Sequence, residues 1–116
     1  MLVDDDKAMT SLLKRMLEME SADFDVHILP TAEKALERFP EIQPDLFMID
    51  YNLKDMNGLD LAHRLRADPA HQATPIVMAS GMDMEQEALA AGVDVFLHKP
   101  FEPGDLAQLF LDLLGR

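Results

Sequence analysis

The chain of 116 residues contains no cysteine. This absence excludes disulfide bonds, thiolate nucleophiles and thiolate metal sites, and it fits a reducing cytoplasm best. The chain also has no apolar run near the roughly 18 residues of a membrane-spanning helix. Its amino terminus carries the acidic run Asp4-Asp5-Asp6 where a signal peptide has basic residues. We therefore expect a cytoplasmic protein that is neither membrane-inserted nor secreted.

Basic residues are few, because ten lysines and arginines face 22 aspartates and glutamates, for a formal net charge of −12. The ten basic side chains form no stripe in the sequence that offsets this charge, and the composition argues against direct binding of nucleic acid. An acidic chain is compatible with a solvated surface, a basic protein partner or carboxylates gathered around a cation. Composition alone does not choose among these three.

The length and a hydrophobic content of 48% suit one compact domain over residues 1–116. No linker, low-complexity tract or internal repeat interrupts it. Short apolar runs alternate with stretches of helical period throughout. This alternation is typical of an α/β fold, a doubly wound parallel sheet covered by helices on both faces. We count five strand-helix units, with strands expected at 2–3, 24–29, 46–49, 75–79 and 93–97.

Local signals place the ends of several helices. Thr31 is expected to cap the second helix, and Pro40 and Pro44 are expected to break the chain after it. Asp83 and Gln86 have the spacing of a capping box for the fourth helix, and Gly92 is expected to end that helix.

Reactive side chains follow the ends of the expected strands. In an open α/β sheet, ligands bind outside the carboxyl ends of the strands, so these groups are expected to share one rim. Three carboxylates on one rim repel, which is tolerable only if one is protonated or a divalent cation binds among them. Mg²⁺ prefers such oxygen ligands and recruits phosphoryl groups. The side chains concerned are Asp4, Asp5, Asp50, Ser80 and Lys99.

These groups suit the transfer of a phosphoryl group. Such transfer needs an aligned nucleophile and positive charge around the phosphoryl oxygens. Asp50 can act as the nucleophile, since an aspartate carboxylate can accept a phosphoryl group covalently. Lys99 and Ser80 can hold the phosphoryl oxygens that a cation does not reach.

Four short motifs stand at the ends of expected strands: Val3-Asp4-Asp5, Ile49-Asp50, Ala79-Ser80 and Lys99-Pro100-Phe101. Together they resemble the receiver domain of response regulators in two-component signalling, the CheY-like superfamily. The resemblance covers the whole chain and implies five parallel strands in the order 2-1-3-4-5, flanked by five helices. Each motif is weak alone, but four in this order, each at a strand end, make a specific match.

The resemblance implies that Asp50 accepts a phosphoryl group from a histidine kinase or a histidine phosphotransfer protein. Asp4, Asp5, Asp50 and the backbone carbonyl of Asn52 would hold Mg²⁺, with Asp5 touching the metal directly. Lys99 would pair with the phosphoryl group, and its bond to the following proline would be cis.

The resemblance also implies a switch. Ser80 matches the hydroxyl that moves toward the phosphoryl group, and Phe96 matches the aromatic ring that then turns inward. This movement would change the face formed by the fourth helix, the fifth strand and the fifth helix, which is also a possible homodimer interface. The chain would act as a signalling module rather than an enzyme, apart from its own phosphorylation and slow dephosphorylation. Its downstream effector or fused output domain, and whether Met1 is the native start, are not predicted.

Two positions depart from the family pattern. Lys54 stands where a proline is common, which leaves the rigidity of the loop after Asp50 open. Met82 supplies no carboxylate or amide that could position water, so the lifetime of the phosphorylated state is not predicted. Asp6 is assigned to a solvated charge run, and the four histidines, which show no metal spacing, to structural or surface roles.

Two other functions compete with the receiver interpretation. A haloacid-dehalogenase-like phosphohydrolase also uses an aspartyl phosphate, but that family has a second aspartate where this chain has Asn52. A pseudo-receiver would act through phosphorylation-independent protein contacts, and the retention of all five rim side chains argues against it.

Overall fold

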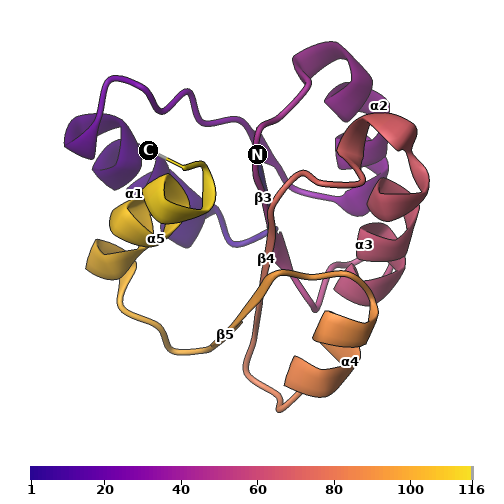
Figure 1. Cartoon of the computed structure of the whole chain (residues 1–116). Coiled ribbons are helices and arrows are strands. Elements are labelled where there is room, and N and C mark those ends of the chain that lie inside the picture. The colour runs from indigo at the N-terminus through magenta and orange to yellow at the C-terminus, as the bar shows by residue number, and fades with distance from the viewer. Residues whose placement is uncertain (116) are drawn as a thin grey trace.

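The computed structural model describes residues 1–115, in which five strands and five α-helices alternate along the chain (Figure 1). The strands are β1 (Leu2–Val3), β2 (Ile28–Leu29), β3 (Phe47–Asp50), β4 (Ile76–Ser80) and β5 (Val95–His98). The helices are α1 (Lys7–Glu20), α2 (Ala32–Ile42), α3 (Gly58–Ala67), α4 (Glu85–Ala90) and α5 (Leu106–Leu113). No helix among the described residues combines the length and the apolar character needed to cross a membrane.

The strands form one parallel sheet in the order β2-β1-β3-β4-β5. The predicted fold class and strand order are therefore confirmed. The second strand along the chain, β2, lies at one edge of β1, and the third, β3, lies at the opposite edge of β1. The strand order thus reverses at β1, and this point in a doubly wound sheet opens a crevice at the carboxyl ends of the strands.

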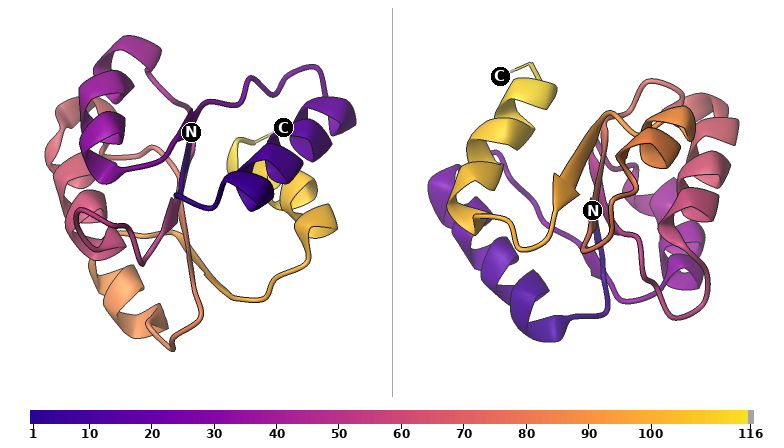
Figure 2. Two further views of the ribbon diagram at one scale, coloured as in Figure 1. Left: turned by 180° about the vertical axis from the view of Figure 1, so that it is seen from behind. Right: turned by 90° about the horizontal axis from the view of Figure 1, so that it is seen from below.

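Helices cover both faces of the sheet. Helices α1 and α5 lie on one face and α2, α3 and α4 on the other (Figures 1 and 2). All four residues of β3 and all five of β4 are buried, as expected of central strands covered on both sides. Alternate residues enter separate cores: Phe47 and Ile49 pack toward α2, α3 and α4, whereas Met48 packs toward α1 and α5.

The second strand is shorter than the predicted 24–29, because only Ile28 and Leu29 pair with β1. The two residues of β1 offer no longer ladder. Side chains of α1 satisfy the backbone of Val26 instead, whose N–H donates to Glu18 and whose carbonyl accepts from Lys14. These side chains take the place of strand pairing before β2.

Two expectations about helix ends were wrong. Pro40 does not break α2, which continues to Ile42 and ends before Pro44, because an exposed proline in the last turn removes one backbone hydrogen bond without breaking the remaining turn. Helix α4 begins at Glu85 and has no side-chain cap, so Asp83 and Gln86 form no capping box. By contrast, Thr31 caps α2 as expected by accepting from the N–H of Lys34.

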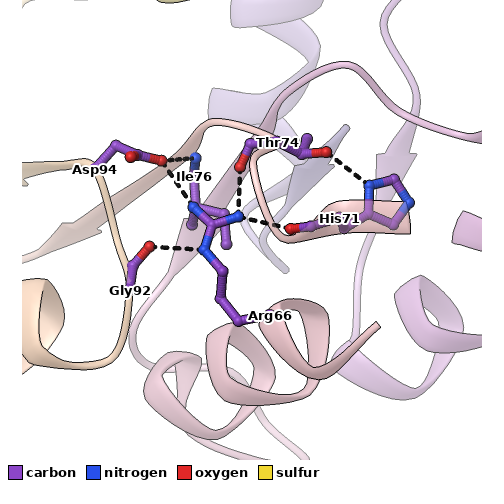
Figure 3. Close-up of polar contacts among 6 residues, drawn as sticks. All are labelled: Arg66, His71, Thr74, Ile76, Gly92 and Asp94. Carbon is purple, nitrogen blue, oxygen red and sulfur yellow. Dashed lines mark hydrogen bonds and ion pairs between the residues drawn. The ribbon is translucent and has the colours of Figure 1, made fainter. Parts of the chain in front are cut away.

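Arg66 ties together the loops at the amino ends of β4 and β5 (Figure 3). Its guanidinium donates to the carbonyls of His71 at 2.8 Å, Thr74 at 2.6 Å and Gly92 at 2.9 Å. It also pairs with Asp94 at 2.8 Å. We call this set of contacts the Arg66 clamp; it holds the edge of the sheet opposite the carboxyl ends of the strands.

Two further contacts reinforce the Arg66 clamp. Asp94 accepts from the first N–H of β4, that of Ile76, at 2.8 Å. His71 is 5% exposed, packs edge-on against the rings of Phe39 and Phe47, and shares a hydrogen bond with Thr74. The structural role expected for this histidine is thus confirmed.

Candidate functional site

The strand ends bring the predicted rim residues to one edge of the sheet. Asp4 follows β1, Asp50 is the last residue of β3, Ser80 the last of β4, and Lys99 follows β5. The registers between neighbouring strands, such as Val3 beside Ile49, align these ends. The rim inferred from the sequence is therefore a site in space.

Three carboxylates meet at the reversal point between β1 and β3. Asp4, Asp5 and Asp50 each present one oxygen, and these oxygens lie within 4.8 Å of one another. Asp50 is 6% exposed and Asp4 9%, so the cluster sits largely inside the crevice. Oxygens bound to one Mg²⁺ at 2.0–2.1 Å lie about 3 to 4 Å apart, so the cluster fits this ion after small adjustments.

Burial raises the pKa of Asp4, and although the backbone N–H of Asp6 counteracts this effect, the charge of Asp50 adds to it. The pKa of Asp4 is therefore higher than usual in the fold. The ionised cluster is short of positive charge, which is the condition that favours binding of a cation.

Lys99 is the cation that faces the carboxylates. Its Nζ donates to Oδ1 of Asp50 at 2.9 Å and lies 3.7 Å from Oδ2 of Asp4. Burial lowers the pKa of Lys99, but the hydrogen bond and charge of Asp50 outweigh it, so the pKa is raised and the ammonium stays charged. The peptide bond between Lys99 and Pro100 is cis, as the resemblance implied.

Ser80 is fully buried at the end of β4, beside the cluster. Its hydroxyl oxygen accepts from the N–H of Met82 at 3.0 Å, and its carbonyl accepts from the N–H of Lys99 at 2.8 Å. Phe96 is half-buried on β5, with its ring edge-on to that of His98 at 5.0 Å between centroids. The two residues matched to the switch therefore lie on neighbouring strands that lead into the site.

The loop after Asp50 folds back on itself at once. Asn52 is exposed and forms an isolated bridge with Asn57, and the N–H of Gly58 donates to the carbonyl of Tyr51 at 2.7 Å. A Cβ on Gly58 would stand 2.8 Å from the carbonyl oxygen of Asp50. Only glycine lets α3 begin this close to the backbone of Asp50. The ligand role of the Asn52 carbonyl stays a prediction.

Two residues at this edge were missed by the sequence reasoning. Asp55 accepts from the N–H groups of Ala32 at 3.1 Å and Glu33 at 2.8 Å, so it holds the start of α2. No local pattern predicts a contact between residues so far apart in the chain. Asp6, although exposed as expected, also caps α1 by accepting from the N–H of Met9.

Comparison with known sequences gives a consistent result. The profile of the family described as Response regulator receiver domain matches residues 1–111. The chain is 37% identical over 119 residues to the transcriptional regulatory protein CpxR of Escherichia coli, covering 100% of this chain and 49% of CpxR. It is 34% identical over 118 residues to the phosphate regulon transcriptional regulatory protein PhoB of Rhizobium meliloti, covering 99% and 51%. The chain thus spans about half the length of these relatives.

Solved structures agree with the sequence comparison. A response regulator from Chloroflexus aurantiacus superposes with a TM-score of 0.87 at 31% identity, over 99% of this chain and 95% of that one. A CheY-like receiver domain protein from Methanospirillum hungatei gives a TM-score of 0.87 at 29% identity, over 98% and 90%. With the family match, the parallel sheet and the acidic rim, the chain belongs to the response regulator receiver domains of two-component signalling.

Proposed function

We propose that Asp50 is the phosphoryl acceptor of this receiver and that its phosphorylation depends on Mg²⁺. The observation that carries the proposal is the surroundings of the Asp50 carboxylate, which accepts a hydrogen bond from the ammonium of Lys99 at 2.9 Å and has an oxygen within 4.8 Å of oxygens of Asp4 and Asp5. A nucleophile, a fixed positive charge and a set of cation ligands thus lie together, and phosphoryl transfer needs little else. Asp4, Asp5, Asp50 and the carbonyl of Asn52 would hold the ion, which when bound offsets negative charge on the phosphoryl oxygens.

In the proposed step, a carboxylate oxygen of Asp50 attacks the phosphorus atom of a phosphohistidine. The new oxygen–phosphorus bond forms as the nitrogen–phosphorus bond breaks, and the imidazole keeps the electron pair. The ammonium of Lys99 already donates a hydrogen bond to Asp50 at 2.9 Å, so it can pair with a phosphoryl oxygen on Asp50 without a large rearrangement. Positioning and charge therefore supply most of the catalysis.

The proposed switch starts at Ser80. Its hydroxyl oxygen accepts from Met82 and keeps its own proton free to donate, so a phosphoryl oxygen on Asp50 can draw it closer. A shift of Ser80 would loosen the segment before α4 and allow Phe96 to turn inward. The partner affinity of the α4, β5 and α5 face would change as a result.

The partners follow from the same proposal. We infer a histidine kinase or histidine phosphotransfer protein as donor, and a downstream effector or fused output domain as the recipient of the signal. The matched relatives are about twice as long and are described as transcriptional regulators, which supports an output domain. Residues 1–116 would form the one receiver domain, although Arg116 itself lies outside the described residues. The α4, β5 and α5 face stays a possible homodimer contact, and a cytoplasmic location without direct nucleic-acid binding stays a prediction.

The test is phosphorylation of the purified chain by a small phosphodonor such as acetyl phosphate, followed by measurement of intact mass. We expect one phosphoryl adduct that requires Mg²⁺ and is lost in Asp50→Asn. Continuous turnover of many phosphoesters would instead indicate a phosphohydrolase of the haloacid-dehalogenase kind. A folded chain without any adduct would indicate a pseudo-receiver.

A further inference from the structure

Lys54 lies in the loop between β3 and α3, and its side chain reaches toward the acidic cluster. Its Nζ is 3.8 Å from Oδ2 of Asp5, in an ion pair whose side chains are 77% exposed for Lys54 and 30% for Asp5. The backbone on both sides of Lys54 is anchored. Leu53 is 9% exposed, and Asp55 bonds to the start of α2. The position of the Lys54 backbone beside the cluster is therefore held by its two neighbours in the loop.

The two lysines at this edge divide the carboxylates between them. Lys99 contacts Asp50 and Asp4, whereas Lys54 contacts Asp5. Asp5 is the most exposed of the three carboxylates, and it is the residue expected to touch a metal directly. Lys54 is thus a cation of the protein itself that pairs with Asp5, the carboxylate expected to bind a divalent ion directly.

We propose that Lys54 sets the affinity of the site for a divalent cation by competing with that cation for Asp5. The inference rests on the proposed Mg²⁺ site. A dication bound among the carboxylates repels the nearby ammonium of Lys54. A carboxylate of Asp5 that binds the dication is also no longer available to pair with Lys54. Because the ion pair is exposed, it is weak enough for the ion to displace Lys54, which then points into water.

The competition has a definite sign and size. Removing the ammonium leaves Asp5 unpaired and removes the repulsion, so Mg²⁺ binds at least about threefold more tightly. The difference shrinks as salt is added, because charges at an exposed site are screened within about 10 Å at 0.1 M ionic strength. A purely structural role for Lys54 would change stability without changing cation affinity in this way.

The experiment is a Mg²⁺ titration of the chain and its variants by calorimetry and by tyrosine fluorescence. Tyr51 is the sole tyrosine, the chain has no tryptophan, and Tyr51 follows Asp50 directly, so its emission reports on the site. We expect tighter binding in Lys54→Met, still tighter binding in Lys54→Glu, and wild-type affinity in Lys54→Arg. Arg15→Met serves as a matched control, because it also removes one exposed cation. Arg15 lies about 12 Å along the axis of α1 from Lys7, the first residue of that helix.

Equal or weaker Mg²⁺ binding in folded Lys54→Met would overturn the inference, as would an equal gain in the Arg15 control. These outcomes leave the proposed function intact, provided the wild type binds Mg²⁺ and takes one phosphoryl group. If the wild type binds Mg²⁺ but Asp50 takes no phosphoryl group, the proposed function fails and the competition still holds. A folded wild type that binds no Mg²⁺ would refute both.

Discussion

Asp4 illustrates at the scale of one residue how the site opposes the stability of its own fold. Burial raises the pKa of this carboxyl, and the charge of Asp50 raises it further, against the backbone hydrogen bond from Asp6. The folded chain thus binds this proton more tightly than the unfolded chain. Stability falls as pH rises from the pKa of the unfolded chain, near the ordinary aspartate value of 3.8, through the higher pKa of the folded chain. Above the pKa of the folded chain the whole penalty is present.

The first prediction concerns Asp4→Asn. In the wild type, Oδ1 of Asp4 accepts from the N–H of Asp6 at 3.0 Å. The amide oxygen of the variant can accept the same hydrogen bond, so the local turn is kept while one repelling charge is removed. Without divalent ions we expect the variant to be more stable by about 1 kcal/mol, seen as a melting temperature higher by roughly 4 °C or more. Thermal unfolding measured with and without Mg²⁺ checks this.

Mg²⁺ should stabilise the wild type in the same experiment, because it binds the folded state alone. Its effect on Asp4→Asn should be much smaller, since one of the ligands is lost. A variant that melts lower than the wild type in the absence of Mg²⁺ would show that the charge of Asp4 is not a source of repulsion.

Among the elements, α2 depends on a residue outside itself. Thr31 bonds to one N–H at its start, and Asp55 from the loop after β3 bonds to two more. Burial opposes ionisation of Asp55, but the hydrogen bonds from Glu33, Ala32 and its own loop outweigh it, so its pKa is lowered. A lowered carboxyl pKa adds stability above the unfolded pKa, and this stability is lost as pH falls through the folded pKa.

The second prediction is that Asp55→Ala destabilises the chain by about 1 kcal/mol at neutral pH, as loss of a helix cap does. The difference from the wild type should shrink as pH falls below 3.8, the ordinary pKa of an aspartate, because Asp55 then becomes protonated. Urea unfolding at several pH values measures this difference. Glu37→Gln is the matched control, because it removes one exposed carboxylate from α2 without touching the cap. A gap that stays constant down to low pH would contradict the role of the charge.

Sequence reasoning succeeded where an element is determined by its own residues. The apolar runs at 46–49 and 75–79 predicted the strands β3 and β4, and reactive groups directly after strands predicted a shared rim. It failed where a partner determines the outcome. Strand β2 is short because β1 is short, and Asp55 reaches α2 across 22 residues. Lys54 was noted only as a departure from proline, since nothing local predicts its approach to Asp5.

In the whole molecule, the two opposite edges of the sheet carry different kinds of interaction. The carboxyl edge carries the repelling carboxylates, and the amino edge carries the Arg66 clamp, in which one guanidinium joins α3 to the loops before β4 and β5. The clamp joins these elements at the edge opposite the site, and none of its residues belongs to the acidic rim.

The third prediction separates these two edges. Arg66→Met should destabilise the fold by about 2 kcal/mol, because it removes the ion-pair partner of Asp94 and the side-chain donor to three backbone carbonyls. Below its melting temperature the variant should still take one phosphoryl group on Asp50. Arg64→Met, an exposed neighbour on α3, is the control and should change stability little. Loss of phosphorylation in folded Arg66→Met would show that the two edges are coupled.

The most direct test of the central claim locates the phosphoryl group within the chain. After reaction with acetyl phosphate and Mg²⁺, borohydride reduces an aspartyl phosphate to homoserine, and tryptic peptides are then sequenced by mass spectrometry. Peptide 39–54 contains Asp50, whereas Asp4 and Asp5 fall in another peptide. We predict homoserine at position 50 and at no other aspartate. Homoserine at position 4 or 5 would contradict the account. The absence of homoserine from all three positions, 4, 5 and 50, would contradict it as well.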